Sequence, residues 1–385
     1  MYDSFKSNID KIVMQYEQLQ AENQELKNQI KILQSQLVTL QNSGNLNIKQ
    51  NVSLPQQQGI PRIQKKLKNK KKILADWSIM QYDFSDSILC VNLMENIITF
   101  GCSDSSVVLF NSTNLNKIGY YNGHKGCINA VVSDSKTGLF ASCSGDGTTH
   151  LWSLRMNDSK FSGQRKSLVE AEEISTNLIL SNDRKPVLCG AWIDGAKLIT
   201  GSSDKKLCIW DAGHSQNAIH VENLNSSVLC LSSPKDDNYF NFAAGLYSGE
   251  IAFFDTRTEK SIFSLSHSKG QIISCSFVQD NYPRFISAGT DKSLRDWDLR
   301  SITENKRSYD IDHVPTKIDV VGKNVAIPTE TGRVRYVNLN RQTITPLSAT
   351  PFSYTISCCS FLNNEGTKLL CGSWDGTAAI AQLSN

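Results

Sequence analysis

The chain has 385 residues, of which 39% are hydrophobic and 20% are charged, and its formal net charge at pH 7 is +3. This length and composition support a sizeable apolar core, but no run approaches the roughly 20 apolar residues that span a bilayer. The small net charge excludes a strong global preference for nucleic acid, and the first residues lack the basic-then-apolar layout of a signal peptide.

Residues 8–41 carry an unbroken heptad repeat. Apolar side chains at the a and d positions predict a coiled coil over residues 1–41, and we expect a parallel homodimer because Asn23 at an a position finds its partner only when two helices align in register. The same seam could instead pack on the rest of the chain or on a helix of another protein. The a positions are Ile9, Tyr16, Asn23, Ile30 and Leu37, and the d positions are Ile12, Leu19, Leu26, Leu33 and Leu40.

Residues 42–72 form a polar linker that becomes rich in lysine. The first part is rich in Asn, Gln, Ser, Gly and Pro and has too few apolar residues to offset the entropy of ordering. Six of the eight residues from Lys65 to Lys72 are lysine. This cluster fits a solvated tether, a nuclear localisation signal, or a patch for nucleic acid or anionic lipid.

The stretch from Gly123 to Trp152 has the layout of one blade of a β-propeller. A Gly-His pair leads into an apolar strand, a second strand follows a polar turn, and an SxDG turn precedes a third strand that ends on Trp152. This spacing allows a hydrogen-bonded chain through His124, Ser142, Asp146 and Trp152. Buried indole and imidazole N–H groups need such partners.

The turn position of Asp146 occurs seven times in the chain, at spacings of 40 to 44 residues with one of 58. Units of this length with four short strands resemble the WD repeat, so we predict an all-β seven-bladed β-propeller over residues 73–385 behind the α-helical coiled coil. A second complete hydrogen-bonded set is expected at His267, Ser287, Asp291 and Trp297, and the other blades are degenerate. The recurring positions are Asp104, Asp146, Asp204, Ser248, Asp291, Thr331 and Asp375.

We expect these Ser/His/Asp sets to be scaffold rather than catalytic triads, because they recur at the period of the blades. No phosphate loop or separate acid/base pair is present, so we expect no catalytic residue and no cofactor. The eleven cysteines are odd in number and show no CxxC or HxxxH spacing, which predicts neither disulfides nor a metal site and favours a reducing intracellular compartment. Several open a repeat, where we expect them to pack as small apolar side chains: Cys90, Cys189, Cys230, Cys275 and Cys359.

Two further segments complete the predicted ring. The seventh repeat reaches only its third strand, so we expect a strand at about residues 75–82 to pair beside it and close the ring. The spacing of 58 marks an insertion at about residues 155–175, which we predict to be a loop, basic in its first half and acidic in its second.

The residue before each turn position is expected to point outward on one face of the propeller. Exposed aromatic side chains often anchor interfaces, so this face is the predicted contact surface. Trp374 could alternatively pack flat over its own blade. The leading candidate contact residues are Trp374 and Tyr247, with Glu330, Lys205 and Lys292 as nearby polar partners.

A closer resemblance extends over nearly the whole chain. The segments AENQELKNQI, GAWIDGAKLITGSSDKKLCIWD, SAGTDKSLRDWDLR and TKIDVVGKNVAIPTETGRVRYVNL, in this order around the lysine tract and the insertion, resemble the WD repeat-containing protein 37 family. That resemblance implies a non-enzymatic intracellular scaffold associated with acidic-cluster sorting adaptors. The coiled coil and propeller also resemble Groucho/Tup-type nuclear corepressors and an autophagy scaffold. An enzyme is the least favoured class, and the expected location is the cytoplasm, the nucleus or both.

Overall fold

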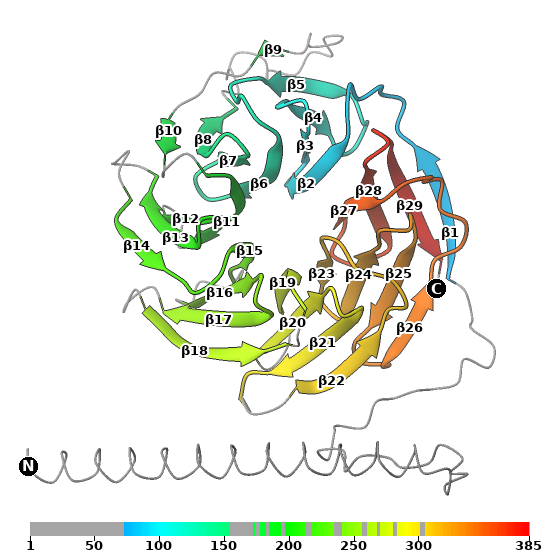
Figure 1. Ribbon diagram of the computed structural model, residues 1–385. Coiled ribbons are helices and arrows are strands. Elements are labelled where there is room, and N and C mark those ends of the chain that lie inside the picture. The colour runs from blue at the N-terminus through cyan, green and yellow to red at the C-terminus, as the bar shows by residue number, and fades with distance from the viewer. Residues whose placement is uncertain are drawn as a thin grey trace, which may run out of the picture. The chain divides into compact units, whose positions relative to one another are not determined.

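The computed structural model describes residues 73–154, 172–173, 178–181, 185–193, 197–212, 218–234, 241–255, 260–267, 270–279, 283–300 and 305–384. These residues form seven sheets arranged around a common axis (Figure 1). The predicted all-β propeller with seven blades is therefore confirmed. The predicted coiled coil with Asn23, the linker and the Lys65–Lys72 tract lie outside the described residues.

Each blade has its first strand innermost in the ring (Figure 1). Blade 1 contains β2 (Ile88–Met94), β3 (Ile97–Cys102), β4 (Val107–Asn111), β5 (Lys117–Tyr121) and β9 (Glu172–Glu173). Blade 2 contains β6 (Ile128–Asp134), β7 (Leu139–Ser144), β8 (Thr148–Ser153) and β10 (Leu178–Ser181). Blade 3 contains β11 (Val187–Ile193), β12 (Lys197–Ser202), β13 (Lys206–Asp211) and β14 (His220–Asn223).

The remaining four blades continue the same pattern. Blade 4 contains β15 (Val228–Ser232), β16 (Asn241–Leu246), β17 (Glu250–Asp255) and β18 (Lys260–Ser266). Blade 5 contains β19 (Ile272–Val278), β20 (Arg284–Gly289), β21 (Ser293–Asp298) and β22 (Asn305–Asp310). Blade 6 contains β23 (Asp319–Val321), β24 (Asn324–Pro328), β25 (Val334–Asn338) and β26 (Thr343–Pro346). Blade 7 contains β27 (Ile356–Phe361), β28 (Lys368–Ser373), β29 (Ala378–Ser384) and β1 (Leu74–Ile79).

The outer strand of blade 7 comes from the beginning of the described chain. β1 pairs antiparallel with β29 over six residues, from Leu74 opposite Ser384 to Ile79 opposite Ala379. The Trp77 indole donates a hydrogen bond to the carbonyl of Ser348 (3.1 Å), and its ring meets Phe352 edge-on at 5.6 Å. Pairing of these two chain segments joins the first and last strands of the ring and covers the edge that β29 would otherwise expose.

The core lies between the blades, where the third strand of each blade contributes one large or apolar buried side chain. The residue at this position is aromatic in blades 1 to 5. None of the seven side chains is more than 5% exposed. The smaller side chains in blades 6 and 7 are equally buried, so packing rather than the indole hydrogen bond holds those two blades. The seven residues are Phe110, Trp152, Trp210, Phe254, Trp297, Val337 and Ala381.

A small residue faces a larger one wherever two neighbouring blades join. A Cβ atom added to Gly245 would lie 2.5 Å from the Sγ of Cys230 and 2.6 Å from the Cγ2 of Ile272, which opens the next blade. Gly101, Gly201 and Gly372 have the same surroundings, each between a cysteine of its own blade and a β-branched residue of the next. All eleven cysteines are free thiols, so the opening-strand cysteines act as side chains of fitting size at these joints.

One side chain spans the inner strands of blades that are not neighbours. Lys317, just before β23 in blade 6, donates hydrogen bonds from its ammonium group to the carbonyl of Asn129 in blade 2 and to that of Leu89 in blade 1 (3.5 Å). The backbone of Lys317 also bridges to Cys358 in blade 7. The Lys317 side chain therefore connects blades 6, 1 and 2.

The structure differs from the sequence analysis within the insertion. Residues 172–173, which the sequence analysis places in a loop, form β9 and pair in parallel with Gly119 and Tyr120 of β5. Blade 1 consequently has a fifth strand, which no other blade has among the described residues. The described residues include no helical segment with the length and hydropathy of a membrane span.

Candidate functional site

The blade 2 set forms a continuous hydrogen-bonded chain from the surface turn to the core. His124 donates from Nδ1 to Asp146 Oδ2 (3.0 Å), and the Ser142 hydroxyl donates to His124 Nε2 (2.8 Å). The Trp152 indole donates to Ser142 Oγ (3.2 Å). These hydrogen bonds connect the segment before β6, the turn between β7 and β8, and the strands β7 and β8. They also satisfy polar groups that would otherwise be buried without partners.

The blade 5 set has the same connections, but the two imidazole nitrogens exchange their roles relative to blade 2. The Ser287 hydroxyl donates to His267 Nδ1 (2.6 Å), and His267 donates from Nε2 to Asp291 Oδ1 (3.3 Å). The Trp297 indole donates to Ser287 Oγ (2.8 Å). Blade 3 keeps only the last link, in which the Trp210 indole donates to the Thr200 hydroxyl (2.8 Å).

Both Ser/His/Asp sets lack access for a substrate. Ser142 and Ser287 have no exposed surface, and each serine oxygen already accepts an indole N–H. A nucleophilic serine needs a reachable hydroxyl beside its base. This geometry supports a structural role for the two sets.

The buried histidines titrate below their ordinary range. Burial lowers the pKa of His124 although Asp146 opposes this shift, and burial likewise lowers the pKa of His267. Burial and the neighbouring His124 lower the pKa of His150 to about 4. Asp146 behaves oppositely: burial raises its pKa, but hydrogen bonds from Thr148 and from the backbone of Lys125 outweigh burial and hold the pKa well below its usual value.

These shifts predict that acid weakens the fold as the pH falls below about 6.5. The unfolded chain binds protons at His124, His150 and His267 near pH 6.5, whereas the folded chain binds them only at lower pH, so the stability that these three neutral histidines contribute is complete above about pH 6.5 and falls as the pH is lowered toward 4. We expect the melting temperature to drop across this window. His150→Phe should reduce the slope of unfolding free energy against pH by an amount equivalent to about one proton. An unchanged slope in thermal melts of that variant would contradict the role given to His150.

Blade 2 also brings together three groups that are typical metal ligands, which the search for sequence motifs missed. One ligand atom each from His124, Asp146 and His150 lies within 4.8 Å of the others. However, the two imidazoles stack with centroids 3.7 Å apart and planes at 21°, so their nitrogen lone pairs run nearly parallel rather than converging on one ion. The Tyr121 hydroxyl donates to His150 Nδ1 (2.5 Å), and stacking with hydrogen bonds accounts for the cluster.

The predicted contact residues lie in equivalent turns between the second and third strands of five blades, which places them on one face of the propeller. Tyr247 is 56% exposed and Trp374 is 55% exposed, and they are among the most exposed large apolar side chains that the structure describes. Glu330, Lys205 and Lys292 are also exposed. We call this surface, defined by these five residues, the turn face.

Hydrogen bonds divide the turn face into two groups. The backbone N–H of Trp374 donates to the Thr355 carbonyl (3.0 Å), and the Thr355 hydroxyl donates to the Glu330 carbonyl (3.0 Å). This connection joins the turns of blades 6 and 7. On blades 3 and 4, Ser227 connects the turn of Lys205 to that of Tyr247 by hydrogen bonds of 2.8 and 3.0 Å. Lys292 lies on blade 5 between the two groups.

The two lysines of the turn face occupy strained positions. Lys205 has φ of +71° and Lys292 has φ of +61°, where blades 2 and 4 place Gly147 and Gly249. The left-handed conformation costs a non-glycine residue about 1–2 kcal/mol. Blade 1 has Ser105 at the same turn position with φ of +74°, so three of the seven turns hold a non-glycine residue in this conformation.

Sequence reasoning missed one residue of this surface. Tyr354 is 65% exposed and precedes Thr355, so it lies next to the group formed by Glu330 and Trp374. It falls in the loop before β27 rather than in a turn with the repeated Asp position. The signal that could have found it is an aromatic residue in the polar segment Phe352–Thr355 between two apolar strands.

The fold and its repeats define the class of protein. A model of the WD40 repeat (WD domain, G-beta repeat) matches residues 115–153 and 177–211, which end on the third strands of blades 2 and 3. The chain thus carries WD40 repeats in a seven-bladed β-propeller, a fold that generally serves as a non-catalytic interaction scaffold.

Individual relatives share modest sequence identity with this chain. A CCR4-associated factor 4 homolog of Vanderwaltozyma polyspora is 26% identical over 244 residues, covering 62% of this chain and 33% of the relative. A ribosome biogenesis protein WDR12 homolog of Culex quinquefasciatus is 28% identical, covering 45% and 37%. Mitochondrial division protein 1 of Candida glabrata is 27% identical, covering 43% and 22%. The chain spans between about a fifth and two fifths of the length of these relatives.

Proposed function

We propose that the protein is a non-enzymatic scaffold that binds partner proteins on the turn face and dimerises through the coiled coil of residues 8–41. The observation that carries this proposal is the pair of exposed aromatic side chains, Tyr247 and Trp374, in equivalent turns of blades 4 and 7. Large aromatic side chains cost free energy in water and are the residues that most often anchor interfaces. Glu330, Lys205 and Lys292 supply charged groups around them.

The kind of partner follows from the resemblance rather than from the turn face itself. The segments shared with the WD repeat-containing protein 37 family support an acidic-cluster sorting adaptor, and the lysines of blades 3 and 5 are compatible with an acidic surface. The relatives' names refer to ribosome biogenesis, a CCR4-associated factor and mitochondrial division. We place the scaffold in the cytoplasm, the nucleus or both.

Affinity purification of the full chain tests the turn face. We expect the double variant Tyr247→Ala, Trp374→Ala to lose its main partners, because each truncation at an interface anchor costs about 2 kcal/mol or more. Ile179 on the outer strand β10 and Ile219 just before the outer strand β14 are each 47% exposed, so Ile179→Ala, Ile219→Ala is the matched control and should keep every partner. A partner set that survives the aromatic double variant would refute the turn face.

Replacing the two lysines gives a second variant, which should bind an acidic partner more weakly without losing stability. Lys205→Gly, Lys292→Gly relieves two left-handed positions and should melt no lower than the natural chain, yet it should weaken any acidic partner. Purification with two differently tagged copies reports dimerisation in the same experiment. Recovery of the second tag is expected, and its absence would remove the dimer from the proposal.

A further inference from the structure

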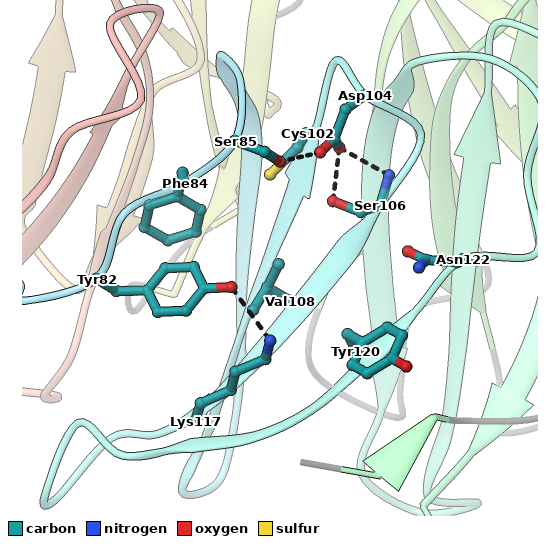
Figure 2. Close-up of a pocket in the computed structure, with 10 residues that line it drawn as sticks. All are labelled: Tyr82, Phe84, Ser85, Cys102, Asp104, Ser106, Val108, Lys117, Tyr120 and Asn122. Atoms are coloured by element: carbon teal, nitrogen blue, oxygen red, sulfur yellow. Dashed lines mark hydrogen bonds between the residues drawn. The ribbon is translucent and has the colours of Figure 1, made fainter.

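Blade 1 carries a hollow of about 400 Å³, lined in part by its Asp104 turn, which is equivalent to the turns that bear the turn-face residues of blades 3 to 7. Its floor is apolar and buried, formed by Phe84, Cys102 and Val108. Figure 2 shows Asp104 with its serine partners at one end of the hollow and Lys117 at the other. The hollow therefore places an anion and a cation at opposite ends of an apolar floor.

The carboxylate of Asp104 is already satisfied. The Ser85 hydroxyl donates to Asp104 Oδ2, and Ser106 donates to Oδ1 from both its hydroxyl (2.6 Å) and its backbone N–H (3.0 Å). Burial raises the pKa of Asp104, but these hydrogen bonds outweigh burial and lower it. Asp104 thus stays ionised and fully occupied by the protein's own donors.

The ammonium group of Lys117 is held in place without an anion. Its Nζ donates to the Tyr82 hydroxyl (3.1 Å) and lies 5.2 Å from the centroid of the Tyr82 ring and 5.1 Å from that of Tyr120. Among the side chains that the structure describes, no carboxylate pairs with Lys117. Two of its three N–H directions therefore remain available to an anion beside the hollow.

The outer edge of β5, the strand that bears Lys117 and Tyr120, already pairs with a short extended segment. β9 pairs in parallel with β5 through only two residues, and both of them are glutamate. An exposed strand edge readily takes an additional extended segment, whose backbone supplies affinity while neighbouring side chains supply specificity. Two residues of pairing is a short contact, which another extended segment can replace.

We propose that the outer edge of β5 and the adjoining hollow form a docking site for an extended acidic segment of a partner protein. The partner segment pairs with β5 in place of β9 and directs a carboxylate to Lys117. This blade 1 site uses none of the five turn-face residues, and its Asp104 lies in the equivalent turn of blade 1, so the docked segment adds a second contact to the same face of the propeller.

The test measures binding of a synthetic peptide to the full chain by fluorescence anisotropy. The probe is fluorescein-labelled LVEAEEIS, the chain's own residues 168–175, and the matched control probe is LVKAKKIS. We expect Glu172→Pro, Glu173→Pro to bind the acidic probe about five-fold more tightly or better than the natural chain, because proline removes the N–H groups that β9 can donate and frees the edge.

Charge reversal at the cation then identifies the site. Adding Lys117→Glu to the proline variant should weaken the acidic probe by about ten-fold or more, whereas Lys323→Glu, at an exposed lysine on blade 6, should change nothing. Thermal melts confirm that both variants are folded. The proposal is overturned if the two probes bind equally, if Lys117→Glu behaves like Lys323→Glu, or if the proline variant binds no more tightly than the natural chain.

Discussion

A chain that begins at residue 80 should lose the cooperative melting of the ring. It lacks β1, and with it six paired residues on β29, the Trp77 hydrogen bond to Ser348 and the Trp77 contact with Phe352. At about 1 kcal/mol for each net hydrogen bond, and with the Trp77 packing in addition, we expect a loss of more than about 4 kcal/mol, a large part of the stability of an ordinary domain.

The matched control is a chain that begins at residue 73, which keeps β1 and removes the same preceding residues. Its melting curve, followed by circular dichroism or calorimetry, should resemble that of the full chain. If the chains beginning at residues 73 and 80 unfold at the same temperature with the same sharpness, β1 does not hold blade 7.

Gly245→Ala should be among the most damaging small substitutions in the core. The new Cβ would lie 2.5 Å from Cys230 Sγ and 2.6 Å from Ile272 Cγ2, and both neighbours are backed by other buried side chains. Overpacking of this kind costs about 1–3 kcal/mol, and we expect the upper end because two blades must separate. Urea unfolding of the purified variant measures the change.

A compensating substitution distinguishes crowding from a general loss of stability. Blade 2 places Cys143 where blade 4 has Gly245, and opposite it has Ala130 in the place of Cys230. Cys230→Ala alone should destabilise the fold, yet combined with Gly245→Ala it should restore part of the lost free energy. Additive losses in the double variant would show that the two side chains do not compete for one space.

The sequence predicts the number of blades because the turn position must recur once per blade. It also predicts which residues can reach one another within a blade, since His124, Ser142 and Trp152 are separated by fixed strand lengths, and the structure places them in hydrogen-bonding contact. Local spacing suffices in both cases, because each strand pairs with the one that follows it.

What the sequence does not predict depends on contacts between elements that are distant in the chain. The buried ion pair of Arg284 and Asp296, with hydrogen bonds of 2.7 and 2.6 Å, joins two strands without any repeated spacing to reveal it. The return of Glu172 to β5 depends on where an insertion with no apolar periodicity comes to lie. Tyr354 was missed because exposure depends on the neighbouring loops as much as on residue type.

Lys317 changes how the ring should come apart. In a closed array whose members touch only their neighbours, opening one joint leaves the other joints intact, so partial opening is inexpensive. The hydrogen bonds from Lys317 to Asn129 and Leu89 connect blade 6 directly to blades 1 and 2, which are not its neighbours in the ring. Opening the ring at blade 7 must therefore also break these two hydrogen bonds and leave the Lys317 ammonium group without them. A partly opened ring is consequently a high-energy intermediate, and the two ends of the propeller are mechanically coupled.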